Sequence, residues 1–110
     1  MCQTYELVVA IVKRGLGEKA VASAVQAGAK GATLLSGRGS GTASVLKVYG
    51  LAMEIEKDVV LIATPAELSR NVADAIDRVA EVEKPGNGLI LVLPVKTGIG
   101  LDKFIPETPA

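Results

Sequence analysis

The 110-residue sequence has no histidine, no tryptophan and a single cysteine, Cys2. One cysteine cannot form a disulfide within the chain, and without histidine the usual zinc and copper ligand sets cannot be assembled. A hydrolytic triad of the usual kind is also excluded, because no histidine can act as its base. The paired carboxylates at Glu54 and Glu56, and at Glu81 and Glu83, are typical of solvated surface. The sequence therefore predicts neither a metal site nor an enzyme active site.

The chain also has no charge excess and no long apolar segment. Its 12 basic and 12 acidic residues cancel, and aromatic residues make up only 3% of the sequence. Nucleic-acid binding is not expected, because the chain has neither a basic arm nor base-stacking side chains. No secretory signal is visible, and apolar runs of about seven residues are far shorter than the roughly 20 needed to cross a bilayer. We expect a cytoplasmic protein without membrane insertion.

Four short apolar runs predict four strands. Three of them are rich in β-branched residues or leucine and lie at 7–12, 59–63 and 89–93, and the fourth lies at 32–35. The runs at 7–12, 59–63 and 89–93 are apolar at both parities, so both faces of each of these strands are apolar. This pattern is unlike that of a sheet with one solvated face, in which apolar and polar residues alternate.

Two helices are predicted between these strands. In the first, apolar residues recur at helical spacing from Ala20 to Val25, and Gly28 is the expected C-terminal residue. The second begins at Thr64-Pro65-Ala66-Glu67, which has the pattern of a capping box with proline at the first helical position. Its apolar face is formed by Leu68, Val72, Ile76 and Val79, and Pro85 to Gly88 ends it.

The predicted order is β-α-β, a long loop, then β-α-β. This order indicates an α+β domain of the ferredoxin-like type spanning residues 1–110, an antiparallel sheet with both helices on one face. Two helices cover one face only, and an uncovered apolar face would exceed the patch size usual for a monomer. We expect a second copy of the chain to cover it. The alternative is that loop and tail residues fold over that face.

Two glycine-rich segments and one lysine are the candidate binding elements. Glycine lets backbone N–H groups approach an anion closely, and arginine or lysine can pair with phosphate or carboxylate. Each element also has a plain interpretation: a flexible hairpin base, an ordinary turn, or a solvated charge cluster between Glu56 and Asp58. The candidate residues are Gly37, Arg38, Gly39, Lys57, Gly86, Asn87 and Gly88.

Three segments, residues 31–39, 56–62 and 86–95, resemble the PII and PII-like signal-transduction proteins. The resemblance covers roughly residues 5–98 and agrees with the element order above. It implies a homotrimeric regulator with adenine-nucleotide sites between subunits. It also implies a T-loop at about 39–53, a B-loop at about 81–88 and a C-terminal tail at about 96–110. The T-loop docks on a target in this family, commonly a membrane transporter or an enzyme, and we expect residues 40–53 to be mobile without ligand or partner.

By the same resemblance, Gly37 and Gly39 match the base of the T-loop, Lys57 faces the cleft, and Gly86 and Gly88 lie near the phosphates. The B-loop lysine usual in the family is replaced by Leu89, so no large preference for ATP over ADP or AMP is expected. Gly41 replaces a T-loop glutamine and the paired C-terminal arginines are absent, which argues against sensing of 2-oxoglutarate. The expected effector is AMP, ADP, ATP or another small anion, with no covalent cofactor. The alternative function is a trimeric metal-tolerance-type or other small-molecule-binding ferredoxin-like protein without nucleotide sensing.

Overall fold

The computed structural model describes residues 4–39 and 55–101 of the chain. Along these residues the elements are β1 (Tyr5–Lys13), α1 (Gly17–Gln26), β2 (Thr33–Gly39), β3 (Ile55–Pro65), α3 (Ala66–Ala80) and β4 (Gly88–Pro94). The strands form one antiparallel sheet in the order β2-β3-β1-β4. The predicted ferredoxin-like α+β fold is confirmed. The prediction that residues 40–53 are mobile concerns a segment outside the described residues.

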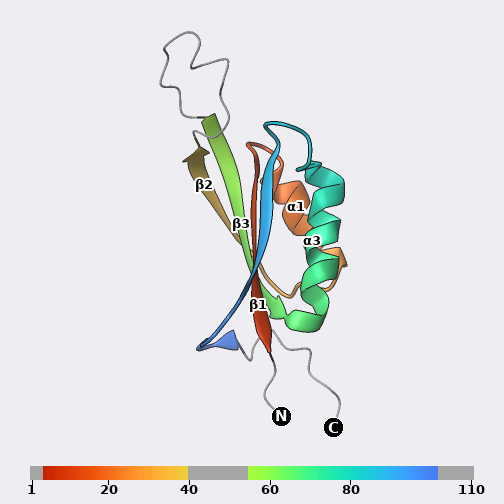
Figure 1. Ribbon diagram of the computed structural model, residues 1–110, viewed down its shortest axis with the longest axis vertical. Coiled ribbons are helices and arrows are strands. Elements are labelled where there is room, and N and C mark those ends of the chain that lie inside the picture. Colours follow the sequence, from red (N-terminus) through yellow and green to blue (C-terminus); the bar gives the residue numbers. More distant parts are fainter. Residues whose placement is uncertain (1–3, 40–54, 102–110) are drawn as a thin grey trace.

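Both helices lie on the same face of the sheet, as Figure 1 shows. Successive strand residues point to opposite faces, so every second residue of β1 and β3 meets the helices. The core between the layers consists of fully buried residues of β1 and β3 packed against small and branched residues of the helices: Val8, Ala10, Val12, Val60, Ile62, Ala20, Ala24, Val72 and Ile76. Alanine on the buried side of α1 lets that helix lie close to the sheet.

The end of α1 is formed as the sequence predicts. Gly28 has φ +116°, a conformation that glycine adopts without steric cost. The N–H of Gly28 donates to the carbonyl of Val25 and that of Ala29 to the carbonyl of Ala24, which is the Schellman arrangement. The chain can therefore turn directly from α1 toward β2.

The start of α3 differs from the prediction. Helix α3 begins at Ala66 and receives no side-chain capping bond, so the predicted capping box does not form. The reason is that β3 continues to Pro65, which keeps Thr64 buried in the sheet opposite Glu6. The backbone carbonyl of Thr4 instead accepts a hydrogen bond from the N–H of Ala66.

Strands β2 and β3 are also longer than the predicted 32–35 and 59–63. Polar residues from Ser36 to Gly39 pair with residues 55–58 beyond the last apolar pair, Leu35 with Val59. Backbone pairing, and not apolar packing, extends the two strands, so the apolar runs alone underestimated their length. As a result, Gly37, Arg38 and Gly39 lie in a strand and not in a loop.

The face of the sheet away from the helices is apolar over most of its length. Residues opposite each other in antiparallel strands share a face, and three successive rows of such residues cross this sheet. The first row is Leu93, Leu7 and Ala63. The second is Leu91, Val9, Leu61 and Thr33, and the third is Leu89, Ile11, Val59 and Leu35. We call this surface the open face. Between 42% and 49% of Leu35, Leu89, Leu91 and Leu93 is exposed in the single chain. The prediction that both faces of the sheet are apolar is confirmed.

Candidate functional site

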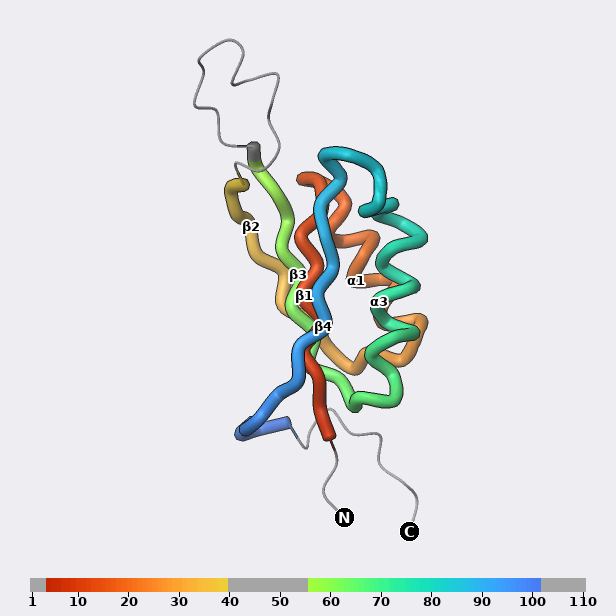
Figure 2. Tube along the Cα trace, viewed as in Figure 1, coloured from red at the N-terminus to blue at the C-terminus, as the bar shows by residue number. Residues whose placement is uncertain are grey.

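Two lysines end the open face, at the last pair of the β1–β3 register. The β1–α1 turn and the α3–β4 turn lie near each other at this end of the sheet (Figure 2). Lys13, the last residue of β1, lies directly opposite Lys57 of β3, and Gly37 of β2 lies opposite Lys57 on its other side. We call Lys13 and Lys57 the basic row. Among the described residues of this row no side chain is acidic. Like charges directly opposite each other destabilise a sheet, so an anion bound between the two ammonium groups would stabilise this pair.

Lys57 also connects the sheet to the turn before β4. Its Nζ donates a hydrogen bond to the backbone carbonyl oxygen of Gly86, 2.9 Å away. The turn is closed by the N–H of Asn87, which donates to the carbonyl of Lys84. Proline at the second position and Gly86 at the third with φ +82° are the residues that a type II turn requires. Two of the three predicted binding elements, Lys57 and the 84–88 turn, are therefore brought together.

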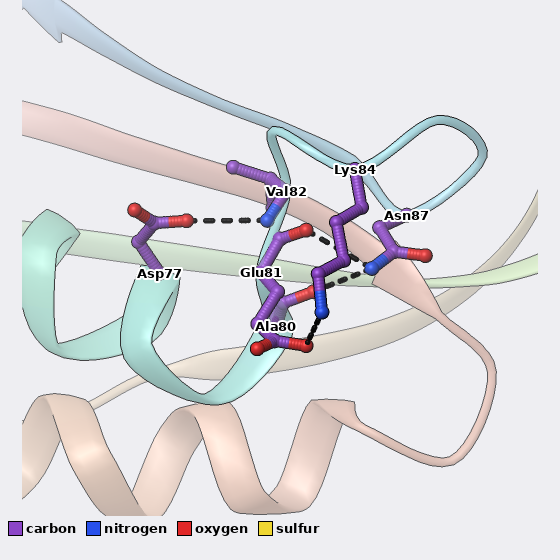
Figure 3. A network of polar contacts seen from close by, with 6 residues as sticks. All are labelled: Asp77, Ala80, Glu81, Val82, Lys84 and Asn87. Atoms are coloured by element: carbon purple, nitrogen blue, oxygen red, sulfur yellow. Dashed lines mark hydrogen bonds and ion pairs between the residues drawn. The ribbon is translucent and has the colours of Figure 1, made fainter.

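Asn87 has a role that the sequence does not reveal. Its side chain is buried and its Nδ2 donates to the carbonyl oxygens of Ala80 and Glu81, at 3.3 Å and 3.0 Å (Figure 3). These carbonyls are at the C-terminus of α3, where the last groups have no partner within the helix. Asp77 supports the same region by accepting a bond from the N–H of Val82. Asn87 thus anchors the turn to α3, and its amide nitrogen points away from the basic row.

Gly88 is required by close packing of the backbone. It has φ +114°, and a Cβ atom there would lie 1.8 Å from the carbonyl oxygen of Ile11. Gly86 has open space around its own Cβ position. The two glycines of the predicted site therefore differ: Gly88 fixes how β4 joins β1, whereas Gly86 is an accessible stretch of backbone beside Lys57.

A concavity of about 260 Å³ lies beside the basic row, along the β2–β3 pair. Predicted residues Gly37, Arg38 and Lys57 line it, and so do residues that the sequence did not single out as ligands: Arg14, Ser36, Glu56 and Asp58. Arg38 lies opposite Glu56, in the row next to that of Gly37 and Lys57. Because successive strand residues point to opposite faces, Arg38 is on the helix side of β2. The concavity is smaller than the roughly 300–1,000 Å³ of most small-molecule sites.

The carboxylates on either side of Lys57 have defined partners, although the Arg14–Glu56 pair remains exposed to solvent. Glu56 forms an ion pair with Arg14 of the β1–α1 turn. Asp58 Oδ2 accepts hydrogen bonds from the N–H groups of Gly15 and Gly17, at 2.9 Å and 3.0 Å. Asp58 thus satisfies the N-terminus of α1 from a neighbouring strand. The approach is close: a Cβ on Gly17 would lie 2.8 Å from that same oxygen, so this position favours glycine.

A second hollow, of about 340 Å³, lies farther along the open face. It is lined by Leu7, Gly31, Ala32, Thr33, Leu61 and Ala63, and we call it the apolar hollow. Leu61 follows Lys57 by four residues of β3, so the apolar hollow and the basic row are about 13 Å apart along the strand. The open face therefore carries a cationic end, the basic row, and one apolar recess, the apolar hollow. This combination suits a ligand with a charged end and an apolar end.

These features make this end of the sheet a candidate binding site. Ammonium groups, the exposed backbone of Gly86 and an apolar recess can hold an anionic small molecule. The two nearby carboxylates are engaged by Arg14 and by the α1 N-terminus. Of the predicted residues, Gly37, Lys57 and Gly86 lie together, whereas Asn87 and Gly88 support the turn behind them. Lys13 was missed, because its pairing with Lys57 depends on a strand register that the sequence alone does not give.

Comparison with known proteins agrees with the fold described above. The crystal structure of Arabidopsis thaliana PII bound to citrate superposes with a TM-score of 0.68 and 24% sequence identity, covering 84% of this chain and 78% of that chain. At this identity the likeness shows the fold alone. No curated protein sequence gives a significant match. Within the described residues, no helix combines the length and apolar character needed to cross a membrane. Residues 5–101 match the family model named Nitrogen regulatory protein P-II, and the chain therefore belongs to this family of regulatory signal-transduction proteins.

Proposed function

We propose that this chain is a PII-type regulator that works as a homotrimer and binds an adenine nucleotide between subunits. The observation that carries the proposal is the basic row at the end of an otherwise apolar, uncovered sheet face. An apolar face needs a partner, and a bound anion would stabilise a pair of opposed lysines. Both conditions are met if the sheets of three copies pack together and an anionic ligand binds where they meet.

The trimer is supported by the three apolar rows of the open face. Four leucines of these rows are each more than two-fifths exposed in the single chain. Transfer of apolar surface out of water stabilises by about 25 cal/mol per Å². Closed cyclic symmetry is the common way for identical chains to cover such a face, and three subunits around one axis would bring the three sheets together. The segment after β4 reaches this face at the Tyr5 end of β1, where the Tyr5 hydroxyl donates a hydrogen bond to the carbonyl oxygen of Leu101, and the four leucines stay exposed.

The nucleotide is supported by the basic row and the apolar hollow of the open face. We place its phosphates on Lys57, Lys13 and the backbone of Gly86, beside Gly37, Arg38 and Gly39, with Asn87 and Gly88 shaping the turn. Each subunit of a cyclic assembly presents the apolar hollow as well as the basic row. One nucleotide can therefore place its base in the apolar hollow of one subunit and its phosphates on the basic row of the next. Leu89 stands where the family usually has a lysine, so this end of β4 adds no positive charge for further phosphate groups. We therefore expect similar affinities for AMP, ADP and ATP.

The regulatory output is proposed to pass through residues 39–53, the T-loop, whose two ends join β2 and β3 next to the site. A ligand at Lys57 lies two residues from the start of β3 and can alter how this segment leaves the sheet. The target is proposed to be a membrane transporter or an enzyme, met in the cytoplasm. A relative of known structure carries citrate, so a small polycarboxylate is a further candidate effector.

Calorimetric titration of the purified protein with AMP, ADP, ATP, cyclic nucleotides, citrate, 2-oxoglutarate and bicarbonate tests the ligand. We expect at least one adenine nucleotide to bind below millimolar concentration. If none does so, the nucleotide part of the proposal is wrong, and the remaining titrations show which other anion the basic row holds. If ATP binds a hundredfold more tightly than ADP and AMP, the interpretation of Leu89 is wrong.

A further inference from the structure

Lys57 is the central residue of the proposed site, yet it lies in a polar stretch of β3 at the outer end of the sheet. The hydrogen bond from its Nζ to the Gly86 carbonyl and the backbone pairing with Gly37 hold one side of it. Toward β1, two further features act on it: the backbone pairing with Lys13, and the side chains of its neighbours in β3. The pairing brings Lys57 opposite Lys13, and repulsion between the two ammonium groups works against that pairing. The neighbours Glu56 and Asp58 point to the other face of the strand, toward the β1–α1 turn.

Glu56 and Asp58 both bind to residues that immediately follow Lys13. Glu56 pairs with Arg14, the next residue of the chain. Asp58 accepts the N–H groups of Gly15 and Gly17. The β1–α1 turn is therefore attached to β3 by one side chain before Lys57 and one side chain after it. On the open face, the positive charges of Lys13 and Lys57 lie opposite each other. On the helix side, the ion pair between Arg14 and Glu56 joins the β1–α1 turn to β3.

We infer that Glu56 and Asp58 are positioning residues, which hold Lys57 and Lys13 together so that one anionic group can contact both. The inference rests on the proposed function for its ligand, but its mechanical part can be measured without one. Both carboxylates are directed to the β1–α1 turn on the helix side of β3, away from the open face where the two ammonium groups lie. Their role is to keep two ammonium groups closer together than their charges favour.

The sign of the effect separates this role from a simple charge effect. Glu56→Gln removes a negative charge near the basic row, and through-space electrostatics alone would tighten the binding of an anion. Positioning predicts the opposite, a loss of affinity of about two- to fivefold, the size expected for one exposed ion pair. Arg14→Gln should weaken binding to a similar extent. The exchanged pair, Arg14→Glu with Glu56→Arg, restores the bridge and should return the affinity to within about twofold of the original.

The matched control is Asp74→Asn. Asp74 forms an ion pair with Arg70 on α3, and its side chain is 49% exposed, the same fraction as that of Glu56. The substitution removes the same charge far from the basic row and should leave the affinity unchanged. Asp58→Ala is the second test of positioning. It should weaken binding at least as much as Glu56→Gln, because two backbone N–H groups lose their acceptor.

The experiment measures ADP affinity by calorimetry for these variants, together with amide hydrogen exchange of the ligand-free proteins. We expect weaker ADP binding by Glu56→Gln, recovery in the exchanged pair, an unchanged melting temperature in both, and faster exchange confined to residues 11–13 and 57–60. Tighter or unchanged ADP binding by Glu56→Gln would overturn the inference. If ADP does not bind the parent protein, the proposed function fails separately. Hydrogen exchange then decides the inference: faster exchange at residues 11–13 and 57–60 supports it, and unchanged exchange refutes it.

Discussion

Leu91→Asp tests whether the open face is the subunit interface. Leu91 lies in the middle apolar row, opposite Val9, and 49% of it is exposed in the single chain. Complete burial of a leucine side chain stabilises by about 1.5–3 kcal/mol, so covering the exposed half contributes about 0.7–1.5 kcal/mol per subunit. Three copies contribute about 2–4 kcal/mol to assembly, before the cost of burying three carboxylates is added. The association constant should therefore fall by at least about thirtyfold to a thousandfold.

The assay is light scattering at micromolar concentration, with circular dichroism to show that the variant remains folded. The parent protein should have about three times the mass of one chain, and Leu91→Asp should move toward the mass of a single chain. Val25→Asp is the matched control, because Val25 is 50% exposed but lies on α1 and not on the open face. The reasoning is refuted if folded Leu91→Asp keeps the trimer mass, or if Val25→Asp dissociates equally.

The remaining predictions concern the turn before β4 and its anchor, measured by urea unfolding at equal protein concentration. Gly88→Ala should lower the free energy of unfolding by about 2–6 kcal/mol, because a positive φ and an overpacked contact with the Ile11 carbonyl each cost about 1–3 kcal/mol. Gly86→Ala, with open space at its Cβ, should cost only about 1–2 kcal/mol; equal losses for both glycines would contradict the packing argument. Asn87→Ala should cost about 1–3 kcal/mol, since two carbonyls at the end of α3 lose their donor. An unchanged midpoint would show that Asn87 does not anchor the turn.

The fold could be predicted from the sequence because its strongest signals are local. Apolar runs at both parities, helical spacing before Gly28 and the glycine-proline turn after α3 each specify one element and its neighbours. The same reasoning underestimated β2 and β3, because residues 36–39 and 56–58 are polar and are held by backbone pairing. It also placed a capping box at Thr64, where continuation of β3 into Pro65 overrides the local pattern.

The site could be predicted only in part, for the same physical reason. Lys57 and Gly86 were found because lysine and glycine beside strand ends have recognisable chemistry. Lys13 looks like any surface lysine until the register places it opposite Lys57, 44 residues away in sequence. Glu56 and Asp58 looked like solvated charges because their partners, Arg14 and the backbone of Gly15 and Gly17, lie in another part of the chain. Contacts between segments that are distant in the sequence can be identified only when the strand register of the sheet is known.

The most direct test of the account is the ADP affinity of Lys57→Ala relative to the parent protein. A charge-assisted hydrogen bond to the ligand is worth about 1.5–3 kcal/mol, so we predict a tenfold to hundredfold loss of affinity. Lys19→Ala, which removes the same charge from an exposed position on α1, is the control and should bind ADP as the parent does. Equal ADP affinity in Lys57→Ala and the parent, with the trimer intact, would contradict the claim that the nucleotide binds at this end of the sheet.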